Sequence, residues 1–444
     1  MTTDVRTPLQ SAGSVDIETL ILVGSSGKFI NLIDYLSELN IYEDIFSNSL
    51  YGNILLVDSR NLLKEVPIVG DEYLVVKIKT PSLNAYISKV FRVYSVTDRE
   101  VVRDLNTQIY TLHFTSKETV IDTLKPLYKS FSGKVSDVAQ SIFNDYVSTK
   151  RTLLPNKDQL KESDDKTQLI VFSETKNNVK FVSPGWTPFK CLNWLASKAI
   201  PQEGKACNYL FFESNKNFYF GNIEKIFNVN FNTGRVNLGK YFYKINNVRE
   251  NDDVNEKMFI AEDFQILKTT DHLSNYDNGY LASRLITLDV INKTYNFYDY
   301  DHVEKFKEYS HSQGDKSIPL FAFDTPRNPL TSIRFYPVHP GLHNLKDNIN
   351  EQMPFIYSNR MSNLLELSNF KIIINVPGRT DAEVGAMLYF SFPDISPKAE
   401  IDVTRTNEDK YYSGYYIVTA LRHKINLQRH TMTMEIVKDA LNNL

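Results

Sequence analysis

The clearest hydrophobic pattern in this chain is a strict alternation near its C-terminus. Between residues 431 and 437, apolar and polar side chains take turns, with Met432, Met434 and Ile436 on one side and Thr431, Thr433 and Glu435 on the other. A period of two is typical of a β-strand that buries one face and exposes the other. Apolar runs at 371–376, 387–392 and 415–421 precede it, with a Pro-Gly turn after the first. Residues 369–444 are therefore predicted to form a small antiparallel β-unit.

The same order of elements occurs earlier in the chain, between Val66 and Val120. Residues 91–96 correspond to residues 416–421, and the alternating run at 109–114 corresponds to the strand at 432–436. The two copies are roughly 320 residues apart, far beyond the ~20 to 50 residues of a stacked solenoid. Two copies of one β-domain, with other material between them, is the simpler interpretation. The alternative is a chance agreement of two short β-meanders, because the shared residue types are common in strands.

The intervening chain mixes helical and strand patterns. Apolar residues on one helical face predict a helix: Val135, Val138, Ala139, Ile142, Phe143 and Tyr146. Thr187-Pro188 is a typical helix start, and residues 355–367 are also predicted to be helical. Two apolar runs, 206–213 and 218–223, flank turn residues and predict a hairpin, which we assign to the second β-domain. Residues 150–167 are charged and predicted as a loop, while 250–278 are polar and compatible with helix.

These patterns predict a mainly β fold with α+β insertions. A chain of 444 residues has a prior of about three domains. We expect two related antiparallel β-barrel (tube) domains and two smaller inserted domains. The expected division is 1–120 for the first tube domain, 121–205 for the first insertion, 206–245 with 367–444 for the second tube domain, and 246–366 for the second insertion.

Eleven strand positions are expected to build the tube domains and to belong to the segments that meet at interfaces. They are Tyr73, Val75, Ile78, Tyr110, Leu112, Phe114, Tyr416, Val418, Met432, Met434 and Ile436.

Composition supports an assembly role more than a nucleic-acid or membrane role. The chain contains 27 Phe and 26 Tyr, residue types that are enriched in strands and in large interfaces. Its formal net charge of -3 argues against a general nucleic-acid binder. Only two cysteines are present, so a disulfide framework or a CxxC motif is not expected, and the chain is predicted to fold in a reducing compartment. No signal-like start and no apolar run near 18 residues occur, so stable membrane insertion is not expected.

A search for chemistry yields no predicted catalytic, cofactor-binding or metal-binding residue. The run Gly24-Ser25-Ser26-Gly27-Lys28 lacks the glycine spacing and the final hydroxyl of a phosphate loop and is interpreted as a turn. His339 and His343 lie in a Pro-Gly loop near Asp347 and Glu351, and surface histidines are the better interpretation. His423 and His430 bracket the final hairpin and are predicted to be loop and strand-end residues. We therefore expect no enzymatic activity and no cofactor.

Several stretches, taken together in their order and spacing, resemble a known family. They are 40–46 with Gly52 and Asp58, 183–189 leading to 209–213, 278–284 to Asp289, and 370–393 with 414–416 and His423. In these residues the chain is similar to the baseplate hub subunit of T4-like contractile-tailed bacteriophages, and more distantly to the hub domains of Mu-like tails and to type VI secretion spike proteins.

The resemblance implies a structural virion protein that works by assembly. Family members form a homotrimer whose six tube domains match the sixfold tail tube, and whose other face binds the threefold central spike protein. The implied partners are further copies of the chain, the spike, tail tube or tube-initiator proteins, the tape-measure protein, and DNA in transit. The implied location is the tail baseplate of the virion, with assembly in the host cytoplasm. Because residues 439–444 close the chain near the last barrel, we do not expect the family's C-terminal grip on the spike.

Two other functions stay open at the level of the sequence. One is a tail-associated cell-wall hydrolase, which would need convergent acidic residues in a cleft. The other is a carbohydrate-binding tail module, which the tyrosine content would suit.

Overall fold

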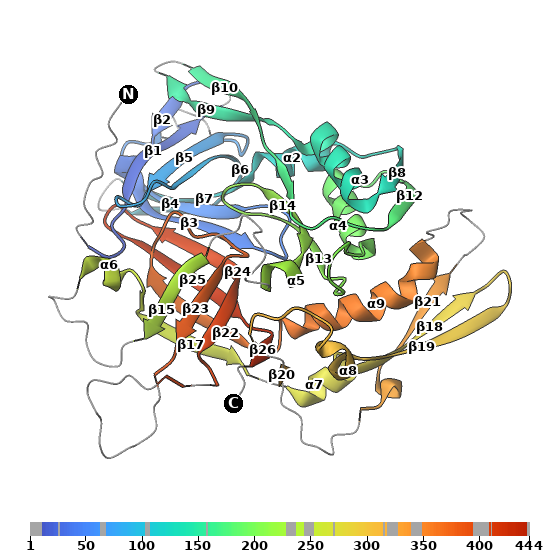
Figure 1. Ribbon diagram of the computed structural model, residues 1–444. Helices are drawn as coiled ribbons and strands as arrows, with labels where there is room; N and C mark the ends of the chain where they lie inside the picture. Colours follow the sequence, from blue (N-terminus) through green and yellow to red (C-terminus); the bar gives the residue numbers. More distant parts are fainter. Residues whose placement is uncertain are drawn as a thin grey trace, which may run out of the picture.

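The computed structural model shows a mainly β molecule with two helical insertions, so the predicted fold class is confirmed (Figure 1). The structure describes residues 11–24, 27–62, 68–102, 107–156, 159–227, 237–243, 253–269, 271–313, 316–317, 327–338, 349–393, 408–409 and 411–441. The described strands include a 14-stranded sheet that runs through both predicted tube regions.

The first unit of this sheet comes from the N-terminal quarter of the chain. Its strands are β1 (Asp16–Val23), β2 (Phe29–Asn31), β3 (Leu36–Asp44), β4 (Tyr51–Asp58), β5 (Tyr73–Lys79), β6 (Tyr86–Val102) and β7 (Thr107–Ser116), with a 3-10 turn at Ile33–Tyr35. They lie in the order β2-β1-β5-β6-β7-β4-β3, and all these pairings are antiparallel.

The second unit combines strands from the middle and the end of the chain. They are β15 (Asn237–Tyr243), β16 (Ile260–Ala261), β17 (Asp263–Lys268), β22 (Lys371–Pro377), β23 (Met387–Ser391), β24 (Gly414–Ile425) and β25 (His430–Val437), with helix α6 (Val254–Lys257) between β15 and β16. Their order β15-β23-β24-β25-β22-β17 repeats the order β1-β5-β6-β7-β4-β3, strand for strand along the sequence. One difference is that β15 is parallel to β23, whereas β1 is antiparallel to β5.

The register of the two units also agrees in detail. In the β6–β7 ladder Val93 pairs with Phe114, and the register then shifts before Ser95. In the β24–β25 ladder Val418 pairs with Ile436, and the register shifts before Ala420. These are the positions that the sequence comparison aligns. A bulge inserts one residue and bends the strand, so the duplication includes this irregularity as well as the regular strands.

Each unit has its own hydrophobic core. The first core includes Leu20, Ile54, Phe91 and Phe114, and the second is centred on the inward side chains of β22, β24 and β25. Glycine is required at position 52 in the first core, because a Cβ atom there would lie 2.2 Å from the Asn40 carbonyl oxygen of the paired strand β3 and 2.5 Å from Cζ of Phe114. The hydrogen-bond ladders do not return on themselves within the described residues, so neither unit is a closed barrel there.

The first insertion combines helices with three small sheets, β9–β10, β8–β12 and β11–β14–β13. Its helices are α2 (Lys117–Leu124), α3 (Val135–Ile142, continued by a π turn at Phe143–Val147), α4 (Pro188–Lys198) and α5 (Ile223–Phe227), and its strands are β8 (Ser130–Lys134), β9 (Lys150–Asn156), β10 (Gln159–Lys166), β11 (Leu169–Val171), β12 (Asn178–Val182), β13 (Tyr209–Glu213) and β14 (Phe218–Asn222). As predicted, α4 starts after Thr187, whose hydroxyl accepts a hydrogen bond from the Lys190 amide at 3.4 Å.

The second insertion is a three-stranded sheet covered on one side by a long helix. Its elements are α7 (His272–Asp277), β18 (Ala282–Asp289), β19 (Thr294–Asp301), α8 (His302–Phe306), β20 (Lys316–Ser317), a 3-10 turn (Pro329–Thr331), β21 (Ile333–Val338) and α9 (Ile349–Glu366). In Figure 1, α9 lies between this sheet and the first insertion. The terminal strand β26 (Ala440–Leu441) pairs with β20 and ties the chain end to this insertion.

Three local predictions differ from the structure. The charged stretch 150–167 contains the β9–β10 hairpin, and 250–278 contains the strands β16 and β17. The hairpin β13–β14 pairs with β11 of the first insertion, and no described strand of the second unit pairs with it. All ten of its residues are buried, because one face packs on the first insertion's core and the other on the second unit's core. The borders of the four expected domains stay predictions.

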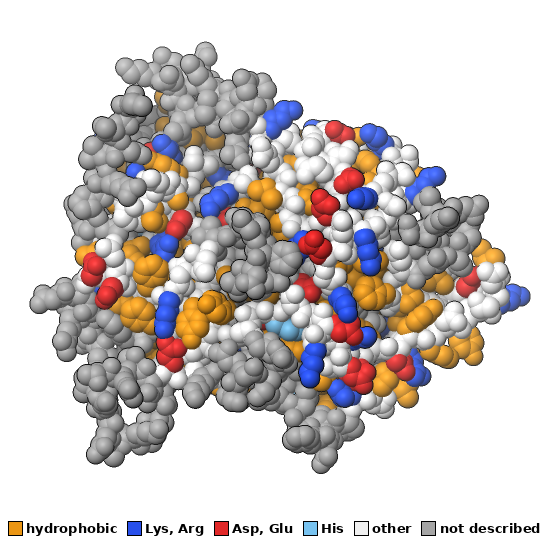
Figure 2. Space-filling model, in the orientation of Figure 1, with side chains coloured by type: hydrophobic (Ala, Val, Ile, Leu, Met, Phe, Trp, Pro, Cys, Tyr) orange, Lys and Arg blue, Asp and Glu red, His pale blue; other side chains and the backbone are white. Residues whose placement is uncertain are grey.

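Charges are distributed evenly over the visible surface. On the face shown in Figure 2, acidic and basic side chains are interspersed, in keeping with the small net charge. This face offers no large area of one sign that would attract a polyanion.

Candidate assembly surface

The two units join through a direct strand pairing. Strand β24 of the second unit is antiparallel to β3 of the first, from Ala420 opposite Asp44 to Ile425 opposite Leu39. The backbone amide of Ile45 extends the contact by donating to the Thr419 carbonyl at 3.0 Å. The junction is therefore a continuous β-ladder rather than a contact between side chains alone.

Polar side chains secure the exposed face of this junction. Arg422 on β24 donates to Oδ1 of Asn40 at 2.9 Å and to Oε1 of Glu38 at 3.2 Å. The ammonium of Lys424 lies 2.9 Å from the other Glu38 oxygen. The pKa of Glu38 is lowered, because these hydrogen bonds and charges outweigh its partial burial. The pairing register of the two units is thus fixed by cross-strand contacts.

The equivalent edges at the far ends of the two units have no partner within the described chain. In β6, which corresponds to β24, residues 94–102 pair with β7 on one side only. In β17, which corresponds to β3, residues 263–268 pair only with β22. Exposed apolar side chains lie at both edges, with Tyr94 54%, Val101 62% and Leu267 46% exposed. An open strand edge is a template for pairing with another chain.

The strand residues singled out from the sequence lie mostly inside the units. Tyr73 is 37% exposed, and the other ten are at most 1% exposed. All but Tyr73 and Val75 belong to one of the two hydrophobic cores, so their side chains hold the strands in place while the strand edges stay available. Their contribution to an interface stays a prediction. The pattern of apolar residues identifies inward positions well, but open edges carry no sequence signal of their own because any residue can pair by its backbone.

A buried carboxylate ties the first insertion to the first unit. Glu213, at the end of β13, accepts hydrogen bonds from the Leu50 amide at 2.9 Å and the Ser116 hydroxyl at 2.6 Å, and its other oxygen lies 2.5 Å from Nζ of Lys89. Burial raises the pKa of Glu213, although Lys89 and Ser116 favour its charged form. The next residue, Ser214, donates to Glu383 of the second unit at 2.7 Å. The β13–β14 tip therefore contacts both units.

Two histidines predicted to lie at a loop and a strand end are buried at the junction of the units. His423 and His430 are 0% exposed, and Nδ1 of His423 lies 3.0 Å from Nε2 of His430. Nε2 of His423 faces Oε1 of Glu43 at 3.6 Å. Burial, together with the neighbouring His423, lowers the pKa of His430 well below its ordinary value. These rings fill space between β3, β24 and β25 and are not a surface pair.

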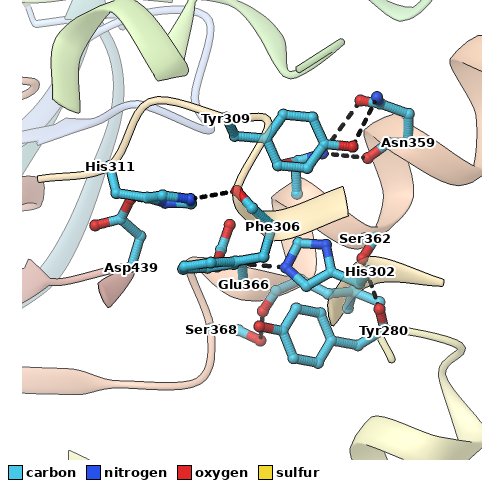
Figure 3. Close-up of polar contacts among 12 residues, drawn as sticks. Tyr280, His302, Phe306, Tyr309, His311, Asn359, Ser362, Glu366, Ser368 and Asp439 are labelled. Atoms are coloured by element: carbon cyan, nitrogen blue, oxygen red, sulfur yellow. Dashed lines mark hydrogen bonds and ion pairs between the residues drawn. The ribbon is translucent and has the colours of Figure 1, made fainter. Parts of the chain in front are cut away.

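A second polar cluster fastens the second insertion to the end of the second unit (Figure 3). His311 lies between Oδ2 of Asp439, at 2.9 Å, and the Phe306 carbonyl, at 2.7 Å, and its ring stacks on that of Phe306. Ser312 also donates to Asp439, through its amide at 3.1 Å. Burial opposes the charge on His311, but the hydrogen bond and negative charge of Asp439 outweigh it and raise the pKa to about 9.

The same cluster continues into a group of packed aromatic rings around the buried His302. Its ring packs against Tyr280, Phe306 and Tyr309, and its Nε2 lies 3.4 Å from Oε1 of Glu366 on α9. Nearby Lys438 donates to the Tyr411 carbonyl at 2.5 Å, and burial lowers its pKa to about 7. His302 thus connects α8 to α9, and His311 connects the segment after α8 to the end of the second unit.

Other motifs considered for chemistry have plain structural places. Gly24 and Lys28 close the β1–β2 turn, where the Gly24 amide donates to the Lys28 carbonyl at 2.9 Å. His339, His343 and Asp347 lie outside the described residues.

Among the described residues, no three His, Cys, Asp or Glu side chains are grouped so that they could hold a metal ion. Cys191 and Cys207 are free and buried. Of the helices the structure describes, none is both long and apolar enough to cross a membrane.

Comparison with known proteins gives a result only at the level of structure. No family model matches the chain, and no curated protein does. The tail protein from Neisseria meningitidis MC58 superposes with a TM-score of 0.51 at 10% identity, over 95% of this chain and 97% of its own. The chain has the fold of phage tail proteins. The 43 kDa tail protein of prophage MuSo2 from Shewanella oneidensis agrees, with a TM-score of 0.50 at 9% identity over 96% and 99% of the two chains. A VgrG-containing complex from Francisella (PdpA-VgrG, lidded) matches at a TM-score of 0.42 and 9% identity, over 98% of this chain and 54% of that one.

Proposed function

We propose that this protein is a structural subunit of a phage tail baseplate, which assembles head to tail into the ring of the central hub. The tail-protein fold supports a structural tail component. The observation that carries the ring is a pair of complementary open edges among the described strands, residues 94–102 of β6 in the first unit and β17 in the second. The proposal includes no enzymatic step.

The internal junction serves as the template for the contact between copies. Because β24 corresponds to β6 and β3 to β17, the β24–β3 pairing repeats between chains as an antiparallel β6–β17 pairing. Arg422 lies opposite Tyr42 in the template. The corresponding residues, through the shared pairing with β7 or β25 and with β4 or β22, are Thr97 and Lys268. Thr97 is therefore expected opposite Lys268 of a neighbouring copy.

A head-to-tail contact of this kind is heterologous, and it closes into a ring when the rotation between neighbours divides a full turn. Two units per chain give a ring of three chains six similar faces. This arrangement would adapt a threefold spike to a sixfold tail tube and leave a central passage for the tape-measure protein and DNA. It follows the expectation from the family resemblance, and it places the chain in the virion tail.

The mass of the protein in solution tests the proposal. The chain of 51.2 kDa is expected to form a trimer, alone at high concentration or on addition of a spike protein, by light scattering after size exclusion. A variant with Val101→Pro in the open edge of β6 should stay monomeric while keeping its circular dichroism spectrum. The control is Phe355→Asp, an exposed site on α9 that belongs to neither edge, and this variant should assemble normally. A wild-type chain that is monomeric under all these conditions would contradict the proposal.

A further inference from the structure

The three-stranded sheet of the second insertion has one buried and one open face. Directly opposite residues of paired strands share a face, so Ile286 lies beside Phe297 on β19 and Phe335 on β21. The same side carries Leu288, two residues after Ile286, and its partner Tyr295 on β19. It also carries Ile333, two residues before Phe335 on β21. We call these six residues the hairpin face: Ile286, Leu288, Tyr295, Phe297, Ile333 and Phe335.

The hairpin face is apolar and well exposed. Phe335 is 66%, Tyr295 62% and Phe297 54% exposed. Hydrophobic side chains are visible over the β18–β19 region on the right of Figure 2. The opposite face packs on α9, with Leu285 0% and Thr287 2% exposed. Contiguous exposed apolar side chains of this kind mark an interaction site.

The charges on the hairpin face are already paired. Arg284 forms a bidentate contact with Asp299, with N–O distances of 2.6 and 2.7 Å, and its guanidinium lies 5.4 Å from the Phe297 ring centroid. The hydrogen bonds between them lower the pKa of Asp299, so the pair stays ionised near neutral pH. A partner that covers this face therefore meets apolar rings and a matched ion pair, which favours an apolar partner surface.

The first insertion carries a second set of exposed apolar residues. Leu124, Tyr128 and Val182 are 74%, 79% and 70% exposed. Val182 lies near Tyr128 because β12 pairs with β8, and the Ser183 amide donates to the Lys129 carbonyl at 2.9 Å. Leu124 ends α2, four residues before Tyr128 in the chain. We call these three residues the insertion patch.

The arrangement of the molecule suggests which partner covers the hairpin face. Within one chain the first insertion packs on the α9 side of the second insertion, where Nη1 of Arg360 donates to the Tyr209 carbonyl at 2.6 Å. In Figure 1 the first insertion lies beside the first sheet unit, and the second insertion lies beside the second sheet unit. When a neighbouring copy adds its first unit beyond β17, its first insertion comes to the side of the second insertion opposite α9. That side is the hairpin face.

We infer that the hairpin face of one chain docks on the insertion patch of the next copy around the ring. This inference rests on the proposed function, because the ring brings the two surfaces together. It adds an outer apolar contact to the inner strand pairing, so each neighbour pair is held at two separate places.

Directed cross-linking between two different variants tests the contact. One chain carries Phe297→Cys and the other Tyr128→Cys, and the native cysteines are buried and do not compete. Mixing the two under mild oxidation should give a disulfide-linked heterodimer. The matched control replaces Phe297→Cys by Leu273→Cys, a more exposed site at 80% that lies on α7, and should give at least tenfold less product.

A double substitution, Phe297→Lys with Phe335→Lys, provides the second measurement. Both side chains point to solvent, so the fold should be kept, and the trimer should dissociate at tenfold or more higher protein concentration than the wild type. This inference would be overturned if the wild type forms a trimer, the Phe297→Cys and Tyr128→Cys chains do not cross-link selectively, and the double lysine variant dissociates at the same concentration as the wild type. That result would leave the proposed ring intact. A wild-type chain that never forms a trimer would overturn both proposals.

Discussion

Replacing His311 by Gln should remove a pH-dependent contribution to stability. The imidazole is buried between Asp439 and the Phe306 carbonyl, and its pKa is raised to about 9 from an ordinary value of 6.5. At 1.36 kcal/mol for each pKa unit, this difference corresponds to roughly 3 kcal/mol. Both side chains are almost fully shielded, with 6% and 1% exposed, so solvent screening reduces this value little.

The sign follows from linkage between protonation and folding. Because the folded pKa lies above the unfolded one, the contribution is fully present below pH 6.5 and is lost as the pH rises through about 9. His311→Gln should therefore destabilise the protein by roughly 3 kcal/mol at pH 6 and by much less at pH 9.5.

Two measurements check this prediction. Thermal unfolding of wild type and variant at both pH values gives the overall effect. Because a chain with several cores need not unfold in one step, hydrogen exchange at the Ser312 amide, which donates to Asp439, reports on the site itself. The control is Leu330→Gln, an exposed site without a titratable group, whose effect on stability should be the same at both pH values. An equal loss of stability at pH 6 and pH 9.5 would refute the reasoning.

Three further predictions concern other buried groups. Burial lowers the pKa of Lys438 to about 7 from 10.5, so the buried charge destabilises the folded protein below pH 7, and this penalty disappears as the pH rises toward 10.5. Lys438→Met removes the penalty, so the variant's stability relative to the wild type should fall by roughly 4 kcal/mol between pH 6 and pH 10, measured by denaturant titration. Glu213→Ala leaves the Leu50 amide and the Ser116 hydroxyl without this acceptor and Lys89 without its counter-charge, and it should cost about 3 to 5 kcal/mol. The double change with Lys89→Met should recover at least half of that loss in the same assay. Gly52→Ala places a methyl group against the Asn40 carbonyl oxygen and the Phe114 ring, so overpacking should cost about 1 to 3 kcal/mol and lower the melting temperature; an unchanged melting temperature would contradict this close packing.

The sequence predicts the strands with one buried face well. The alternation of Met432, Met434 and Ile436 reports side chains that all point into one core, and the structure shows each of them fully buried. The alignment of 91–96 with 416–421 holds through the bulges, because a duplicated strand keeps its irregularities together with its apolar positions.

Strands without such a face are where prediction from sequence fails. The hairpin β13–β14 is buried on both sides, so its continuous apolar run gives no indication of the sheet to which it belongs. The β17 strand alternates only between exposed and half-buried residues, with Phe264 and Ile266 facing the core and charged residues around them. Because the difference in polarity between the two faces of β17 is small, the sequence of residues 250–278 is also compatible with a polar helix.

The polar clusters could not be found from sequence because their members are distant in the chain. His311 and Asp439 are 128 residues apart, and Glu213 meets Leu50 across 163 residues. Nothing in the local pattern distinguishes His423 from a loop histidine, since its burial comes from the packing of β24 against β3. The open edges of β6 and β17 are likewise visible only once the pairing of every described strand is known.

Cross-linking at the β6 and β17 edges tests the central claim most directly. Thr97→Cys and Lys268→Cys, introduced together in one chain, should form disulfides between chains and give a covalent closed trimer under oxidising conditions. The intrachain template, Tyr42→Cys with Arg422→Cys, should cross-link within one chain in the same register. If the template pair links and the Thr97–Lys268 pair does not, in a sample whose mass is that of a trimer, the head-to-tail pairing of the duplicated units is wrong.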